Sequence, residues 1–232
     1  MLISGLQKLT LLDYPGKVAC TVFTGGCNLR CPFCHNASLV LPQRLSEAAI
    51  PEEEVFAFLK KRSGMLDGVA VTGGEPLLHA DIVPFLRKIK ELGYLIKLDT
   101  NGSFPERLEM LIREGLADRV AMDVKNSPSL YAETAGIAGL DLTPFAKSRD
   151  LLLSGMVEAE FRTTVVKGLH TEESLIEAAK WIAGAPEYYL QQFKDSGDIL
   201  APGSFSAFDR EEMLALAEAV RPYVPSVQVR GV

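Results

Sequence analysis

Three cysteines lie close together in the stretch GGCNLRCPFCHN, residues 25–36. Cys27, Cys31 and Cys34 have the spacing C-x3-C-x2-C. Thiols this close in sequence are typical of metal ligands, and a metal site built from thiolates normally has four of them. The pattern therefore predicts a metal centre to which this loop supplies three ligands. It leaves open what occupies the fourth position.

Zinc and iron–sulfur sites answer that question differently. A structural zinc ion would need a fourth Cys or His. Cys20 lies in a predicted strand and is expected to be a small buried hydrophobe, His35 is awkwardly adjacent to Cys34, and His79 and His170 would have to approach through the fold. An iron–sulfur cubane fits better, because three thiolates leave one iron open and an open metal position is typical of a reactive site. A small molecule with amine and carboxylate groups would then fill it.

The overall composition is that of an ordinary globular chain. Of the 232 residues, 47% are hydrophobic and 23% are charged, which is enough apolar sequence for a sizeable core. The net charge of −6 argues against nucleic acid as a partner. We find no signal-peptide pattern and no apolar run of about 18 residues, so no membrane span is expected. Four cysteines, three of them clustered, favour a reducing cytoplasm over a disulfide framework.

Short β-branched runs alternate with longer amphipathic segments along the chain. The strands that we expect are residues 18–23, 68–72, 94–100, 119–125, 158–166 and 187–193, with a final short strand at 226–230. The helices that we expect are residues 51–63, 81–92 and 105–114, helical pieces between 128 and 155, a helix after the cap residue Thr171, and a last helix that begins at Asp209 with Glu212 in a capping box. This alternation, repeated about six times, predicts a parallel sheet with right-handed crossovers.

Six strand–helix units are too few for a closed eight-fold barrel, which needs about 250 residues. They suit an open doubly wound sheet or an incomplete barrel. We predict the latter, an α/β fold that forms an incomplete (β/α)6 TIM-like barrel with parallel strands. One domain is expected over residues 1–232, with a core at about 17–193 and a C-terminal helix and short strand at 205–232.

Polar and glycine-rich segments follow the predicted strands. They are TGG at 24–26, TGGEP at 72–76, DTNG at 99–102 and DVK at 123–125. Ligands of parallel α/β folds bind at the carboxyl ends of the strands. We therefore expect these four segments to form one pocket with the three cysteines.

Together these motifs resemble those of the radical S-adenosylmethionine superfamily. The cysteine spacing with Phe33 directly before Cys34 is similar to its cluster loop, and TGGEP resembles its glycine-rich element. LDTNG at 98–102 and MDVK at 122–125 resemble elements of its glycyl-radical enzyme activases. The longer stretch LTLLDYPGKVACTVFTGGCNLRCPFCHN resembles activating proteins of anaerobic ribonucleoside-triphosphate reductase, and pyruvate formate-lyase activating enzymes are near relatives. The resemblance covers roughly residues 9–193.

The resemblance implies a [4Fe–4S] cluster on Cys27, Cys31 and Cys34 whose open iron binds S-adenosylmethionine. It implies that one electron cleaves the sulfonium bond and that the resulting 5′-deoxyadenosyl radical abstracts an α-hydrogen from a glycine of a partner protein. It further implies an electron donor such as flavodoxin or ferredoxin. Because no cysteine follows Cys34, ligands for a second cluster are not expected.

The glycine-rich element and the aromatic residue have expected roles under this resemblance. Gly73 and Gly74 would bring backbone carbonyls close to the methionine amino group, since no Cβ intervenes, and Glu75 would add a carboxylate. Phe33 is expected beside the adenine. A tight strand–helix turn and a core aromatic are the purely structural alternatives.

Charged and polar residues at later strand ends complete the predicted site. By the same resemblance, the oxygens of Asp99, Thr100 and Asp123 hold a monovalent cation beside the cofactor carboxylate or position the ribose, and loop-capping aspartates are the alternative. Arg162 would either clamp the cofactor carboxylate or pair within the sheet. Lys125 would do similar work or be solvated.

Two further ambiguities remain at the sequence level. One of Gln191 and Gln192, which end the sixth strand, is expected to face the pocket. Arg30 would either offset the charge of the cluster thiolates or lie at the surface.

An activase of anaerobic ribonucleoside-triphosphate reductase is the predicted function. The alternatives are an activase of pyruvate formate-lyase or of another glycyl-radical enzyme, a small-molecule enzyme similar to the deazapurine-forming synthases, and a non-catalytic metal-binding module. An incomplete barrel would leave a lateral gap through which a glycine loop of the partner could enter.

Overall fold

The computed structural model of the chain describes residues 1–41, 49–195 and 197–232. One sheet of eight strands forms its centre, and the order of the strands in space follows their order in the chain. The strands are β1 (Ile3–Thr10), β2 (Ala19–Thr24), β3 (Gly68–Gly73), β4 (Leu95–Thr100), β5 (Arg119–Asp123), β6 (Glu158–Val165), β7 (Tyr188–Gln192) and β8 (Val227–Arg230). The helices are α1 (Ala37–Val40), α2 (Glu52–Lys61), the 3-10 turn η2 (Pro76–Leu78), α3 (Ile82–Glu91), α4 (Pro105–Arg113), α5 (Tyr131–Thr134), α6 (Thr143–Leu153), α7 (Glu172–Trp181) and α8 (Arg210–Val220).

The predicted parallel strands are confirmed, with one correction. Strands β2 to β8 pair in parallel with their neighbours, but β1 pairs with β2 in antiparallel orientation and was not predicted. A turn at Tyr14–Lys17 explains the reversal. Pro15 and Gly16 occupy its centre, Gly16 has a φ of +72°, and the N–H of Lys17 bonds to the carbonyl of Tyr14. The sheet therefore extends beyond the predicted core on both sides, to β1 and to β8.

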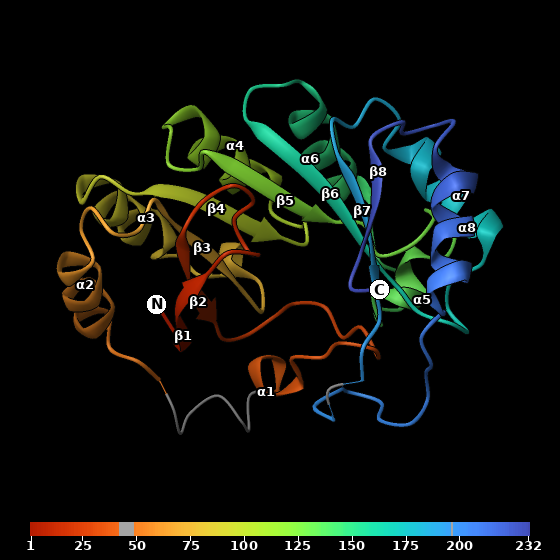
Figure 1. Cartoon of the computed structure of the whole chain (residues 1–232), viewed down its shortest axis with the longest axis horizontal. Coiled ribbons are helices and arrows are strands. Elements are labelled where there is room, and N and C mark those ends of the chain that lie inside the picture. The colour runs from red at the N-terminus through yellow and green to blue at the C-terminus, as the bar shows by residue number, and fades with distance from the viewer. Residues whose placement is uncertain (42–48, 196) are drawn as a thin grey trace.

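The sheet is curved but not closed. Figure 1 shows its strands bending into a trough, with the longer helices ranged around the outside. In the part of the chain that the structure describes, β1 and β8 are the edge strands and no pairing joins them. The predicted incomplete, TIM-like barrel is thereby confirmed.

The two faces of the sheet differ in chemistry. Alternate residues such as Val71, Leu98 and Val120 are completely buried within the hydrophobic core. The residues between them point to the inner face of the sheet and include Lys97 on β4 and Arg119 on β5. These two residues are paired in register. The helices supply the apolar cover of the outer face, and the inner face carries the polar groups.

Local signals place the helices where they were predicted. Helix α7 begins after a capping box of Thr171 and Ser174, and α8 after one of Asp209 and Glu212. Helix α3 ends before Gly93, whose φ of +86° terminates it. Among the described residues, no helix combines the length and the apolar character that a membrane span requires.

Candidate functional site

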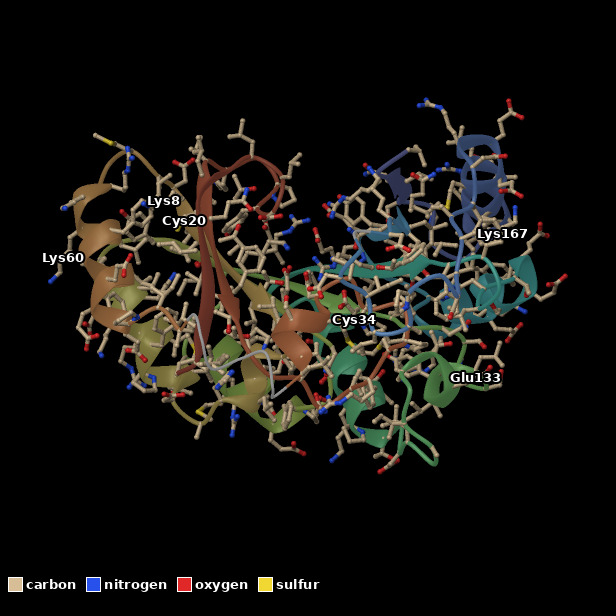
Figure 2. All side chains as sticks on the ribbon, turned by 90° about the horizontal axis from the view of Figure 1, so that it is seen from below. Lys8, Cys20, Cys34, Lys60, Glu133 and Lys167 are labelled. Carbon is tan, nitrogen blue, oxygen red and sulfur yellow. The ribbon has the colours of Figure 1, made fainter. Side chains whose placement is uncertain are left out.

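The cysteine loop leaves the carboxyl end of β2 and folds beneath the sheet. Cys27, Cys31 and Cys34 line one pocket together with residues from the ends of β3, β4, β5 and β6. The other lining residues are Leu29, Phe33, His35, Asn36, Val40, Gly73, Gly74, Asn101, Asp123, Lys125 and Thr164. Figure 2 places Cys34 near the middle of the molecule, well apart from Cys20. Three of the four predicted strand-end segments line the pocket with the cysteines, whereas TGG at 24–26 supplies no lining residue and packs against the TGGEP turn.

Backbone contacts fix the shape of the cysteine loop. The N–H of Arg30 donates to the carbonyl of Ala135 over 2.9 Å, and the Arg30 guanidinium donates to the carbonyls of Cys27 and Leu29 over 2.6 and 2.7 Å. Gly136 lies so close that a Cβ there would be 2.1 Å from the Arg30 oxygen. Arg30 is exposed as a residue, so of the two predicted roles the surface one is confirmed, with the addition that its guanidinium ties the loop.

The environment of the three thiols favours their neutral form in this structure. Burial raises the pKa of Cys31 to about 12, and burial also raises the pKa values of Cys27 and Cys34 above 9. A metal or cluster binds the thiolate, so its binding must release these protons.

The TGGEP turn packs directly on the loop that carries the cysteines. The N–H of Gly74 donates to the carbonyl of Thr24, and that of Glu75 to the carbonyl of Gly26, each over 2.8 Å. A Cβ on Gly74 would lie 1.9 Å from the Gly26 oxygen. Only glycine permits this approach, and the approach brings the turn to the edge of the cysteine pocket.

The carboxylate of Glu75 is turned away from the pocket and is completely buried. It accepts hydrogen bonds from the N–H of Leu77 (3.0 Å), the hydroxyl of Thr100 (2.8 Å) and the N–H of Asn101 (2.7 Å). Burial raises its pKa to about 7 in spite of these donors. Glu75 therefore links the TGGEP turn to the end of β4.

A network of charges lies on the inner face next to the pocket. The Arg162 guanidinium donates to Asp99 over 2.9 Å and to Asp123 over 2.9 and 3.1 Å, and Lys125 donates to Asp123 over 2.9 Å. Lys97 is 1% exposed and bonds to Asp99 over 2.5 Å. Burial opposes the charge of the two carboxylates, but these cations outweigh it and hold both pKa values below the ordinary 3.8.

The predicted site residues separate into two groups in space. Phe33, Gly73, Gly74 and Asp123 line the pocket with the cysteines. Glu75, Asp99, Thr100 and Arg162 lie behind that lining, where their polar groups bond to one another or to the backbone. Arg162 pairs with Asp123 within the sheet, and Lys125 also pairs with Asp123.

Seven residues in the lining were not among the predicted ligand and cofactor-binding residues, and three of them lie at or near the ends of strands. Asn101 belongs to the DTNG segment, and its position directly after β4 was the available signal. Thr164 lies two positions after Arg162 on β6, on the same face of the strand. Lys125 lies two positions after Asp123, in the DVK segment that was expected to form part of the pocket. Gln191 and Gln192 line a neighbouring recess with Arg230 and His35, so neither faces the cysteine pocket itself.

The donor set fits a cluster better than a single ion. Within residues 1–41, 49–195 and 197–232, no three His, Cys, Asp or Glu side chains converge as ligands of one ion would. A [4Fe–4S] cluster offers each thiolate a separate iron, so its ligands need not meet at a point. One buried and two partly buried thiols line this pocket, and no fourth thiol lines it among the described residues, which matches a cluster that keeps one iron open.

The comparison with protein families decides between a single metal ion and an iron–sulfur cluster. The family model described as the radical SAM superfamily matches residues 21–143, which is more than half of the chain. The chain belongs to the radical SAM superfamily. The cofactors of this superfamily are a [4Fe–4S] cluster and S-adenosylmethionine, and Cys27, Cys31 and Cys34 line the pocket in which such a cluster would bind.

Individual relatives of this radical SAM protein confirm the predicted resemblance to activases. A Methanocaldococcus jannaschii protein, whose name proposes it as a glycyl-radical enzyme activating enzyme, is 31% identical over 245 residues, covering 100% of this chain and 96% of its own. Pyruvate formate-lyase 1-activating enzyme of Escherichia coli is 30% identical over 172 residues, covering 72% of this chain and 68% of its own.

Solved structures share the fold at low sequence identity. A radical SAM methyltransferase from Sphaerobacter thermophilus has a TM-score of 0.72 and 16% identity, over 94% of this chain and 67% of its own. Streptococcus suis SuiB bound to S-adenosylmethionine has a TM-score of 0.70 and 18% identity, over 90% of this chain and 49% of its own. These likenesses support the open α/β barrel.

Proposed function

We propose that this radical SAM enzyme activates a glycyl-radical enzyme, and that its partner is anaerobic ribonucleoside-triphosphate reductase. When bound, the cluster and S-adenosylmethionine supply a 5′-deoxyadenosyl radical, which takes a hydrogen atom from the glycine Cα and leaves 5′-deoxyadenosine and a glycyl radical. The observation that carries the activase part of the proposal is the end-to-end match to the activase-like relative, which spans 100% of this chain. The choice of the reductase as partner rests on the resemblance of the stretch LTLLDYPGKVACTVFTGGCNLRCPFCHN.

The arrangement of the site supports a large substrate. The sheet is open between β1 and β8, and the recess lined by Gln191, Lys194 and Arg230 adjoins the cysteine pocket through His35 and Thr164. A loop of a partner protein could approach the cofactor from this side. The neighbouring side chains are polar amides and cations, which bind peptide backbone and carbonyl groups.

The residues of the chain have separate tasks in this proposal. The three cysteines hold the cluster, the Gly73–Gly74 backbone faces the amino group of S-adenosylmethionine, and Phe33 lies beside its adenine. Asp99, Thr100, Asp123 and Arg162 act through their internal pairing, which keeps the strand ends in register. Arg162, Lys97 and Lys125 already balance the carboxylates of Asp99 and Asp123. These carboxylates therefore offer little net negative charge to a monovalent cation.

The electron donor and the compartment are further parts of this proposal. We propose flavodoxin or ferredoxin as the donor, since a low-potential cluster needs a low-potential reductant. A reducing cytoplasm suits four cysteines that are all free thiols.

An isotope experiment tests the proposal. The anaerobically reconstituted protein is mixed with S-adenosylmethionine, dithionite and a candidate reductase whose glycines carry deuterium at Cα. We expect a glycyl-radical signal in electron paramagnetic resonance and one deuterium in the 5′-deoxyadenosine. A reductase with Gly→Ala at the radical position is the control and should give neither.

Two outcomes would contradict the proposal at different levels. A radical on pyruvate formate-lyase but not on the reductase would replace the partner and keep the activase. Rapid turnover of a deazapurine precursor without any protein partner would replace the activase by a small-molecule enzyme.

A further inference from the structure

Asn101 contacts the cysteine loop from the end of β4. Its side-chain nitrogen lies 3.9 Å from Sγ of Cys27 and 3.0 Å from the side-chain oxygen of Asn28. The residue is 5% exposed and lines the pocket of the three cysteines. Its amide is therefore a buried donor directed at a predicted cluster ligand.

Hydrogen bonds fix the orientation of the Asn101 side-chain amide. The Asn101 oxygen accepts the N–H of Ser103 over 2.9 Å, so the nitrogen must be the atom that faces the sulfur. The Asn101 backbone N–H is held by Glu75 over 2.7 Å. Asn28 in turn donates to the hydroxyl of Ser103 over 2.9 Å, which closes a ring of contacts between the two loops.

A second donor reaches the same sulfur from the loop itself. The N–H of Leu29 lies 3.4 Å from Sγ of Cys27. Hydrogen bonds to cluster sulfurs stabilise negative charge, and reduction adds one electron to the cluster, so each donor favours the reduced state. Removal of a side-chain donor is possible by substitution, whereas the backbone donor of Leu29 stays.

The geometry points to Asn101 as a positioning residue that raises the reduction potential of the cluster through its hydrogen bond to Cys27. This inference rests on cluster binding by the three cysteines and not on the identity of the partner. It assigns a purpose to Glu75 as well, because the buried carboxylate holds the backbone that carries the amide.

A redox titration tests the inference without S-adenosylmethionine or any partner. Wild type, Asn101→Ala and Ser103→Ala are reconstituted, their iron is counted, and the reduced cluster is followed by electron paramagnetic resonance against applied potential. For Asn101→Ala we expect full iron and, at the wild-type midpoint, a reduced-to-oxidised ratio about tenfold lower, which is a one-electron shift of 59 mV to more negative potential. Ser103→Ala keeps its backbone N–H and should titrate like wild type.

A second variant keeps the inference testable if Asn101→Ala does not bind the cluster. Asn101→Asp keeps the size of the side chain and the oxygen that accepts from Ser103, but loses the donor, and its midpoint should also become more negative. An unchanged midpoint in either variant with full iron would overturn the inference. Loss of iron from both, with normal loading of Ser103→Ala, would overturn it too, because the residue would then hold the loop and not tune the potential. Neither result bears on whether the partner is a glycyl-radical enzyme.

Discussion

The guanidinium of Arg162 binds the carboxylate of Asp123, with Nε and Nη2 donating to the same oxygen over 3.1 and 2.9 Å. The third nitrogen, Nη1, reaches Asp99 over 2.9 Å. One side chain on β6 thereby joins the ends of β4 and β5. Arg162 and Asp99 are largely buried, and Asp123 is partly exposed at the pocket, so most of this charge is balanced within the protein rather than by water.

Removal of Arg162 should destabilise the protein strongly. Arg162→Met would leave Asp99 and Asp123 buried with less compensation, and breaking a buried ion pair in this way costs about 3–5 kcal/mol. We expect that loss in the free energy of unfolding of the apoprotein, measured by urea denaturation at pH 7. Arg113→Met is a matched control, because the Arg113–Glu109 pair is exposed and should be worth less than about 1 kcal/mol. Equal effects of the two substitutions would contradict the role of Arg162.

The pKa of Glu75 predicts a pH dependence of stability. Burial raises that pKa to about 7 from an ordinary 4.5, so the folded state binds the proton more tightly than the unfolded state. The stabilisation by this group is full below pH 4.5 and is lost as the pH rises through 7. Between pH 5 and 7.5 the wild-type apoprotein should lose on the order of 2 kcal/mol that Glu75→Gln does not lose.

Urea denaturation of both proteins across this pH range measures the Glu75 effect. The difference between wild type and variant isolates Glu75 from the other titrating groups. Parallel stability curves for the two proteins would show that Glu75 does not titrate there.

A methyl group at position 74 should disrupt the junction of the two loops. The added Cβ of Gly74→Ala would lie 1.9 Å from the Gly26 oxygen, and both atoms belong to backbone that must then shift. We expect a loss of roughly 3 kcal/mol in the free energy of unfolding, together with weaker binding of S-adenosylmethionine in calorimetry of the reconstituted protein.

Gly5→Ala is the control for position 74. Its Cβ would meet only the side chain of Phe23, at 3.3 Å or more, and Gly5 also has an ordinary φ. It should cost less than about 1 kcal/mol and leave binding intact. Normal binding by Gly74→Ala would show that the close approach is dispensable.

Substitutions of the cysteines should distinguish a cysteine that binds the cluster from one that only packs in the core. Cys31→Ala should abolish stable cluster binding, because two thiolates do not hold a cubane well. Cys20→Ala should keep the full iron content and lose about 1 kcal/mol of stability, since Cys20 is completely buried in β2 away from the pocket. Iron analysis and the absorbance of the reconstituted proteins measure both effects. A Cys31→Ala protein with full iron would contradict the ligand assignment.

The sequence alone determined the features that depend on local pattern. Alternating apolar runs located β2 to β8 and the main helices, because side-chain periodicity follows backbone geometry directly. The spacing of Cys27, Cys31 and Cys34 predicted the cluster loop, since three thiols in one short loop can reach the same cluster. The turn at Pro15 and Gly16 was also visible in the sequence. The strand before it was missed because its buried and exposed residues do not alternate regularly, and it lies at the edge of the sheet.

Tertiary structure decided how the polar residues are used. Glu75, Asp99 and Arg162 carry charges suited to bind a cofactor, and their partners come from strands 25 to 63 residues away in the chain. No local pattern specifies such a partner, because register and sheet order bring it into contact only in the folded state. The amide of Asn101 gained its contact with Cys27 for the same reason: the end of β4 lies over a loop that precedes it by more than 70 residues.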